Sequence, residues 1–136
     1  AVVVVRTAPG RGAVAVVGVG GVGRRMGEGR MGGEGQPRAQ LAGLPRYGLF
    51  GMPMQRAVSA PRWLLGKTWG DASVTLKLED RVAPDLIAQL KAAGHAVEIL
   101  DSYSSTMGHA GAIVSHPNGV LDGATDPRSD RAGAAW

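Results

Sequence analysis

Met31-Gly32-Gly33-Glu34-Gly35-Gln36-Pro37 separates two unlike parts of this 136-residue chain. Glycine has no Cβ atom, so the successive backbone N–H groups of Gly32 and Gly33 can turn toward one point and stabilise an anion there. Before this stretch the chain consists almost entirely of Ala, Val, Gly and Arg, whereas after it the apolar residues follow the periods of helices and strands. We therefore predict that residues 31–136 form the folded part. Residues 1–30 are expected to be a low-complexity segment, disordered or not native to the fold.

The first segment contains a glycine pattern that is typical of dinucleotide-binding proteins. β-branched runs at residues 2–5 and 13–17 favour two strands, and the second leads into Gly18-Val19-Gly20-Gly21-Val22-Gly23, which satisfies G-x-G-x-x-G. A dinucleotide site also needs a helix after the third glycine, and the many glycines of residues 24–35 disfavour one. The acidic residue expected about 20 positions further on is missing as well. A dinucleotide-binding segment at residues 18–23 therefore remains the weaker alternative.

Charge and composition exclude several classes of function. Residues 1–30 hold five arginines and one glutamate, which accounts for the net charge of +4 of the whole chain. Residues 31–136 carry ten basic and ten acidic side chains, so this part has no electrostatic footprint for nucleic acid. The absence of cysteine excludes disulfides, thiolate metal sites and a cysteine nucleophile. No apolar run is long enough to cross a bilayer, so no membrane partner is expected, and the choice between cytoplasm and periplasm stays open.

The middle of the chain predicts helices first and then a strand, a helix and a strand. Residues 37–50 and 53–60 have helical spacing, with a break or kink near Leu44 because Pro45 removes a backbone donor. A short strand is expected at residues 62–66. Val74, Leu76 and Leu78 alternate with polar residues, which predicts a strand buried on one face. The predicted helix at residues 84–93 has an apolar face and ends at Gly94, and residues 97–99 continue as a strand.

The last part of the chain predicts a β-hairpin followed by a polar loop. The apolar run at residues 110–115 precedes Pro117-Asn118-Gly119, a strong turn signal, after which Val120 begins a returning strand. Asp126-Pro127-Arg128-Ser129-Asp130 has the composition of a loop. The whole pattern of residues 31–136 indicates a mixed α/β (α+β) fold.

Several of these stretches resemble the small-subunit end of the γ-glutamyltransferase (γ-glutamyltranspeptidase) family, which are N-terminal-nucleophile hydrolases. The matching stretches are residues 31–37, 46–47, 50–52, 60–66, 68–70, 103–113 and 126–130. They extend over roughly three quarters of the chain. The resemblance implies part of an αββα sandwich and an enzyme that acts on γ-glutamyl amides such as glutathione. It also implies a large-subunit partner, because the family's precursor cuts itself into two subunits and frees an N-terminal threonine.

By the same resemblance, the catalytic residues of this chain are Gly32 and Gly33, whose backbone amides form the oxyanion hole. No nucleophile is identified, because every threonine is internal and none matches the family's processing site. The threonines are Thr7, Thr68, Thr75, Thr106 and Thr125. We expect this fragment to be inactive alone. A non-catalytic structural or binding remnant of the same fold is the alternative, and the choice between transfer and hydrolysis and the exact acyl group stay open.

Other polar residues carry weaker signals. His95, His109 and His116 are 14 and 7 positions apart and lack a carboxylate at helical spacing, so we predict no metal site and no cofactor. Asp126 and Asp130 are candidates for an acid/base pair, but a solvated loop is the better interpretation. Residues 104–106, Ser-Ser-Thr, are suited either to binding an anion or to capping the following turn.

Overall fold

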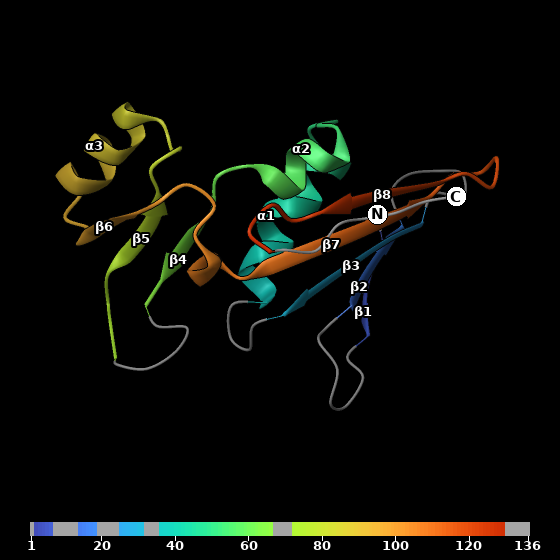
Figure 1. The fold of residues 1–136 in the computed structure, drawn as a ribbon, viewed down its shortest axis with the longest axis horizontal. Helices are drawn as coiled ribbons and strands as arrows, with labels where there is room; N and C mark the ends of the chain where they lie inside the picture. Colours follow the sequence, from blue (N-terminus) through green and yellow to red (C-terminus); the bar gives the residue numbers. More distant parts are fainter. Residues whose placement is uncertain (1, 7–13, 19–24, 32–35, 67–71, 130–136) are drawn as a thin grey trace.

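The larger of two sheets joins the beginning and the end of the chain. The computed structural model describes residues 2–6, 14–18, 25–31, 36–66 and 72–129, and side chains from residue 42 onward. The larger sheet has the strand order β1-β2-β3-β7-β8, and all neighbours are antiparallel (Figure 1). Its strands are β1 Val2–Arg6, β2 Val14–Gly18, β3 Arg25–Met31, β7 His109–Ser115 and β8 Leu121–Thr125.

The first strands bear on the interpretation of residues 1–30. β1 and β2 lie at the two β-branched runs, and β2 pairs with β3 in an antiparallel register. A strand, rather than a helix, therefore follows the glycine-rich residues, and the dinucleotide alternative lacks its βαβ unit. The described parts of this segment are paired strands, and β3 crosses residue 30 while it pairs with β7. The expected disorder of residues 1–30 stays a prediction. The division of the chain at residue 30 stays a prediction.

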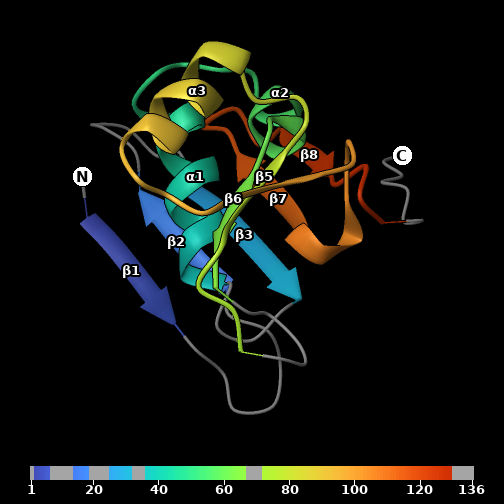
Figure 2. The same ribbon diagram turned by 90° about the vertical axis from the view of Figure 1, so that its left-hand side faces the viewer.

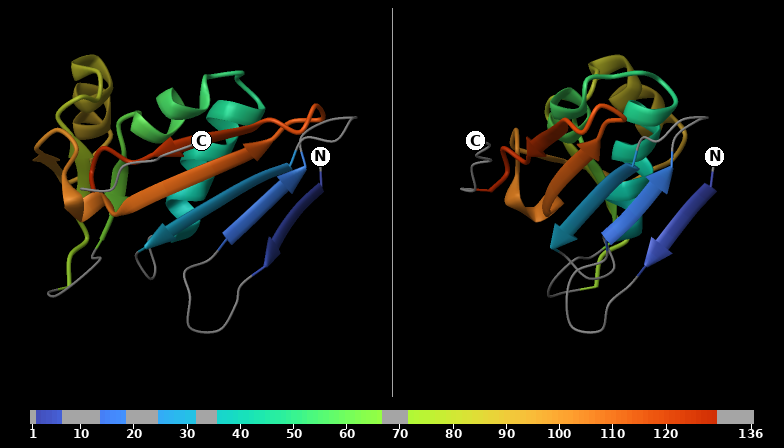
Figure 3. Two further views of the ribbon diagram at one scale, coloured as in Figure 1. Left: turned by 45° about the vertical axis from the view of Figure 1, so that its right-hand side comes forward. Right: turned by 90° about the vertical axis from the view of Figure 1, so that its right-hand side faces the viewer.

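Helices α1, Gln36–Gly48, and α2, Met54–Ser59, cover one face of the larger sheet (Figures 1 and 3). Their apolar side chains meet the inward side chains of β7 and β8, which alternate along each strand. The core consists of Met54, Val58, Ala110, Ala112, Val114 and Ala124, with Leu44 and Tyr47 packed against it. The core is small and is built mostly from short side chains, which fits the low aromatic content of the chain.

Of the predicted break or kink near Leu44, the break is wrong, because α1 continues through Pro45. A kink there stays a prediction. Leu44 and Tyr47 lie on either side of the proline and both pack against the core, so tertiary contacts hold the helix on each side of the missing backbone donor. The Pro45 carbonyl also accepts hydrogen bonds from the N–H groups of Leu49 and Phe50, which end the last turn. The second helix ends before Pro61, as predicted.

A smaller sheet has the order β4-β5-β6 and lies beside one end of the larger one (Figures 1 and 2). Its elements are β4 Trp63–Leu65, β5 Leu76–Glu79, α3 Pro84–Ala92 and β6 Val97–Leu100, and the 3-10 turn η1, Ser105–Met107, leads on to β7. β5 and β6 are parallel, with α3 between them in sequence. The predicted strand, helix, strand unit is therefore confirmed.

Two details of this unit differ from the sequence pattern. Val74 precedes β5 and is 87% exposed, so the buried alternation begins only at Leu76. None of the residues of α3 is buried, although its sequence is amphipathic, because little of the chain covers its apolar face. Gly94 ends the helix as predicted: it has φ +90°, and its N–H donates to the Lys91 carbonyl.

The predicted β7–β8 hairpin is confirmed. Its strands pair from Ser115 with Leu121 to Gly111 with Thr125, and the turn places Gly119 at φ +82°. The N–H of His116 donates to the Val120 carbonyl and closes the turn. Alternation along β7 directs Val114 into the core and leaves Ile113 on the opposite face.

Val114 and its neighbour Ile113 provide a matched pair of substitutions. Val114 is 0% exposed, so Val114→Ala should lower the free energy of unfolding by about 2 to 3 kcal/mol, because two buried methyl groups are lost and a cavity remains. Ile113 is 57% exposed, and Ile113→Ala should cost less than about 1 kcal/mol. Urea unfolding of both variants measures the difference, and equal losses would contradict this assignment of the core.

Candidate active-site loop and its buried support

Gly32 and Gly33 lie outside the described residues, but both neighbours of their loop are described. β3 ends at Met31 and α1 begins at Gln36, so the glycine pair connects a strand end to a helix start. Met31 pairs with His109, the first residue of β7. The described residue before the glycine pair, Met31, therefore lies at the end of the larger sheet where β7 begins.

The backbone at this end of the sheet is held by a buried carboxylate. The N–H of Ala110 donates to Oδ2 of Asp126 over 2.7 Å, and Ala110 is the register partner of Arg30 in β3. Asp126 thus orients the strand beside the last residues of β3. His109 stands next to it, and its Nε2 atom is buried without a hydrogen-bond partner in the described part of the chain.

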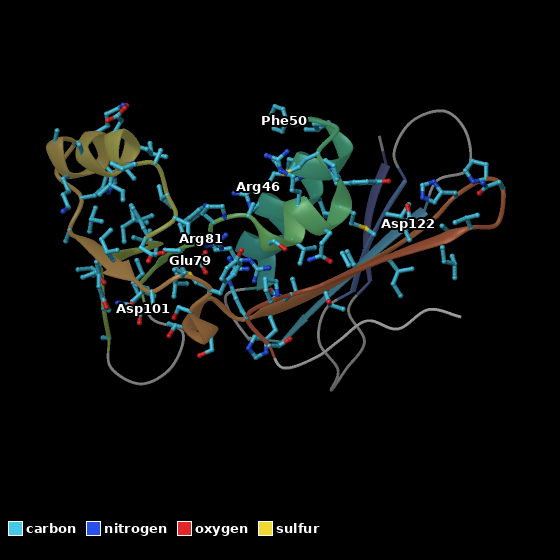
Figure 4. All side chains as sticks on the ribbon, turned by 45° about the horizontal axis from the view of Figure 1, so that its top comes forward. Arg46, Phe50, Glu79, Arg81, Asp101 and Asp122 are labelled. Atoms are coloured by element: carbon cyan, nitrogen blue, oxygen red, sulfur yellow. The ribbon has the colours of Figure 1, made fainter. Side chains whose placement is uncertain are left out.

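Asp126 belongs to a group of ionised side chains that we call the arginine–carboxylate cluster: Arg62, Glu79, Arg81, Asp126 and Arg128. Arg62 Nη2 lies 2.6 Å from Asp126 Oδ2, and Arg128 Nη1 lies 2.9 Å from Asp126 Oδ1. Arg128 also binds Glu79 with two nitrogens, at 2.6 and 2.7 Å. Arg81 Nη2 adds a third contact to Glu79, at 2.6 Å. The labelled Glu79 and Arg81 lie where the two sheets meet (Figure 4).

The same arginines also bind the end of α2. Arg62 Nη2 donates to the Val58 carbonyl, Arg81 Nη1 to Ser59 and Arg128 Nη2 to Ala60, over 2.9 to 3.2 Å. The last carbonyls of a helix lack partners within it and carry partial negative charge, so cations stabilise them. The cluster therefore joins α2, the smaller sheet and the loop after β8.

Three residues of the cluster contradict the sequence pattern. The alternation of β5 places Glu79 on the outer face, yet Glu79 is 0% exposed because it is surrounded by arginine donors. Asp126 and Arg128 were expected in a solvated loop, yet they are 1% and 5% exposed. Buried charges are tolerated when each is paired and hydrogen-bonded, and this pairing is a tertiary property.

The pKa directions indicate that Glu79 and Arg128 stay ionised. Burial by itself raises the pKa of Glu79, but the hydrogen bonds and charge of Arg128 and the hydrogen bond of Arg81 outweigh it and hold this pKa below its ordinary value. Burial lowers the pKa of Arg128, and its contacts with Glu79 and Asp126 raise it above the ordinary value. At neutral pH this pair therefore carries fixed charges and is unsuited to proton transfer. Asp130, the other member of the candidate acid/base pair, lies outside the described residues.

The ring of Tyr103 packs over the cluster, and no sequence pattern indicated this contact. The Arg81 guanidinium carbon lies 3.7 Å from its ring centroid, and that of Arg128 lies 5.5 Å away, so both make cation–π contacts. Tyr103 has φ +57°, a conformation that is uncommon for a residue with a side chain. Tyr103 therefore has this uncommon backbone conformation at the position where its ring contacts the guanidinium groups of Arg81 and Arg128.

The remaining candidate residues are dispersed. Ser105 and Thr106 lie in η1, and Ser104 precedes it without a side-chain capping bond, so the capping interpretation is wrong, and anion binding stays a prediction. His95 follows α3, whereas Nε2 of His116 lies 2.6 Å from Asp122 in the hairpin. Within the described ranges, no group of three His, Cys, Asp or Glu side chains could hold a metal ion. No described helix is long and apolar enough to cross a membrane.

Comparison with known proteins identifies the family. The sequence profile of the gamma-glutamyltranspeptidase family matches residues 17–136. The chain belongs to this family. The oxamate amidohydrolase proenzyme of Klebsiella pneumoniae is 59% identical over 114 residues, which are 84% of this chain and 22% of that protein. The glutathione hydrolase-like YwrD proenzyme of Bacillus subtilis is 44% identical over 104 residues, which are 76% of this chain and 20% of YwrD. The chain thus spans about a fifth of the length of these curated relatives.

Solved structures support the fold. The transpeptidase CapD of Bacillus anthracis superposes with a TM-score of 0.71 at 20% identity, over 93% of this chain and 72% of that chain. The gamma-glutamyltranspeptidase of Pseudomonas nitroreducens complexed with L-DON gives 0.69 at 23% identity, over 96% and 67%. The mixed α+β fold is therefore confirmed, and the match of the family profile confirms the resemblance to the γ-glutamyltransferase family.

Removing one charge from the cluster tests its contribution to stability. Arg128→Met should lower the free energy of unfolding by about 3 to 5 kcal/mol, because Glu79 and Asp126 would keep their buried charges with fewer partners. Arg56 is exposed on α2, and Arg56→Met should change stability by less than about 0.5 kcal/mol. Thermal or urea unfolding measures both. A loss below about 1 kcal/mol for Arg128→Met would be inconsistent with a supporting role for the cluster.

The lowered pKa of Glu79 predicts acid sensitivity. The unfolded chain takes up this proton near the ordinary glutamate pKa of about 4.3, and the folded chain only at lower pH. The contribution of Glu79 to stability is therefore present above about pH 5 and is lost as the pH falls through the folded-state pKa. The slope of unfolding free energy against pH between about 5 and 3 should be smaller in Glu79→Gln than in the natural sequence, and equal slopes would contradict the pKa direction.

Proposed function

We propose that this chain is the C-terminal part of the small subunit of an amide-cleaving member of the family, with Gly32 and Gly33 as its oxyanion hole. The observation that carries the proposal is the place of the glycine loop. It begins directly after Met31, whose pairing partner His109 adjoins the strand position that Asp126 holds. A loop on a rigid, buried support is suited to aiming backbone amides at a reacting oxygen.

The proposed reaction needs a nucleophile from the rest of the proenzyme. A threonine hydroxyl at the new N-terminus attacks the amide carbonyl, and its own α-amine accepts the proton. The carbonyl oxygen then carries negative charge, which the N–H groups of Gly32 and Gly33 stabilise. Collapse of this intermediate releases the amine and leaves an acyl-threonine, which water or an acceptor amine then attacks. The 136-residue chain alone lacks the attacking group and should not turn over substrate.

The larger sheet supports a role as part of a layered sandwich. Ile113 and Leu121 lie on the face opposite α1 and α2, and they are 57% and 63% exposed. In an αββα sandwich this face packs against a second sheet. The proposed large-subunit partner would therefore cover this face of the larger sheet, and the glycine pair would lie at the border of the covered area.

We propose γ-glutamyl amides such as glutathione as the first substrate class, on the resemblance to the family and the name of the B. subtilis relative. A second candidate is a small oxo-acid amide such as oxamate, because the K. pneumoniae relative that carries this name is 59% identical. Assays of the full-length proenzyme with γ-glutamyl anilide, glutathione and oxamate separate the two. Adding an acceptor dipeptide distinguishes transfer from hydrolysis.

The glycine pair can be tested in the full-length proenzyme. Gly33→Val should lower kcat by about 100-fold or more and change KM less, because a β-branched residue prevents the backbone from aiming its N–H group. Arg56 is exposed on α2, on the opposite side of the larger sheet from the proposed second sheet, and Arg56→Ala should leave kcat within about two-fold.

Two results would count against the proposal. An unchanged kcat in Gly33→Val would remove the oxyanion assignment. Turnover by the isolated 136-residue chain would remove the need for an outside threonine, and the absence of turnover in the full-length proenzyme would favour a non-catalytic remnant.

A further inference from the structure

An apolar groove of about 570 Å³ lies between α3 and the smaller sheet. Leu86 and Leu90 of α3 form one wall, and Trp63 and Leu65 of β4 form part of the other. Trp63, Leu65 and Leu86 are 44%, 47% and 48% exposed. Large apolar side chains gathered in one exposed surface are a feature of interaction sites.

The sheet side of the groove is one continuous apolar face. Trp63 is the register partner of Leu78, and Leu65 is the partner of Leu76. Partners opposite each other on neighbouring strands point to the same side, and every second residue returns to it. These four side chains all line the groove, whereas Leu64, which points to the other side, is buried.

Arginines line one end of the groove and exceed the carboxylates that face them. Arg46 and Arg81 both border it, and Figure 4 shows them from α1 and from the end of β5. Nη2 of Arg46 donates to the Pro61 carbonyl over 3.0 Å, and no carboxylate of the described residues forms an ion pair with Arg46. Nε of Arg81 is buried and has no hydrogen-bond partner within the same described part.

In the described residues, arginines therefore outnumber carboxylates at this end of the groove. Arg46 adjoins the arginine–carboxylate cluster, in which three arginines already share Glu79 and Asp126. Burial and the positive charge of Arg128 lower the pKa of Arg46. An additional carboxylate at this end of the groove would offset the surplus charge and supply an acceptor.

We propose that the groove binds an apolar segment that carries an Asp or Glu side chain, from the part of the proenzyme outside this chain. The inference rests on the proposed function. The arginines at one end of the groove favour an acidic side chain in the bound segment, and the exposed leucine and tryptophan side chains favour an apolar segment. We assign this segment to the rest of the proenzyme because this chain matches only 22% and 20% of the two curated proteins.

A polypeptide segment fits better than a small apolar carboxylate. Sites for small molecules bury most of the ligand surface. This groove is open along a rim formed by Trp63, Leu65 and Leu86, each about half exposed. Such a rim is suited to a partner that covers the side chains from outside.

The test uses the full-length proenzyme, in which the rest of the protein is present, and follows the hydrogen exchange of the amides of residues 86–90. Leu86→Ser and Arg46→Glu should each speed this exchange at least ten-fold. Val74→Ser and Arg56→Glu are exposed controls away from the groove lining, and each should stay within two-fold.

A comparison with the 136-residue chain adds a reading that does not depend on the variants. The amides of residues 86–90 should exchange at least ten-fold more slowly in the full-length proenzyme than in the 136-residue chain, while octanoate, an apolar carboxylate probe, should give that chain no such protection. Circular dichroism confirms that each variant is folded, and Leu86→Ser remains the test if Arg46→Glu does not fold.

Three results would overturn the inference: no slower exchange in the proenzyme, equal exchange in Leu86→Ser and the natural sequence, or protection of residues 86–90 by octanoate alone. The proposed function fails by a different measurement. It fails when the full-length proenzyme cleaves none of the three amide substrates, whatever the groove binds.

Discussion

The ion pair between Glu79 and Arg128 holds the two sheets of this protein together. The two residues are 49 positions apart, one at the end of β5 and the other in the loop after β8, and they make two parallel hydrogen bonds. Such a bidentate contact has a defined geometry as well as a favourable energy. Because both side chains are fully buried, the charge of each depends on the other, and the junction of the sheets depends on both.

The cluster around this pair extends to the candidate active-site loop in a few steps. Arg128 binds Asp126, Asp126 accepts the N–H of Ala110, and the strand that contains Ala110 pairs with the last residues of β3. The glycine pair follows directly. Catalytic loops carried by a rigid scaffold hold their groups more accurately than loops without such support. The charges of Glu79 and Arg128, which persist at neutral pH, therefore serve geometry rather than proton transfer.

Two apolar surfaces remain open around this scaffold. One is the face of the larger sheet opposite α1 and α2, and the other is the groove beside α3. Both are consistent with a chain that spans about a fifth of its curated relatives. The two surfaces differ in charge, because the groove ends at Arg46 and at Arg81, whose buried Nε has no hydrogen-bond partner in the described residues. Apolar area alone would allow many partners, whereas a surplus of positive charge selects an acidic one.

Local patterns in the sequence predicted much of the fold. Pro117-Asn118-Gly119 determines a hairpin and Gly94 ends a helix because turns and caps depend on the backbone preferences of neighbouring residues. The strand, helix, strand unit follows from apolar periods within one short stretch. The glycine pair, its flanks and the other matching stretches indicate the family from the sequence alone. These features belong to the sequence because each is encoded within a few consecutive residues.

Only the tertiary structure placed Glu79, Asp126 and Arg128 in the interior. By period and by composition each is an exposed residue. Their burial is tolerable because distant partners add to the near ones: Arg128 binds Glu79 from 49 positions away, and Arg62 binds Asp126. The same holds for α1, which continues through Pro45 because packing on both sides outweighs one missing backbone donor. The burial of a charge and the survival of a helix depend on partners that the folded chain brings together from distant positions, and local sequence carries no record of them.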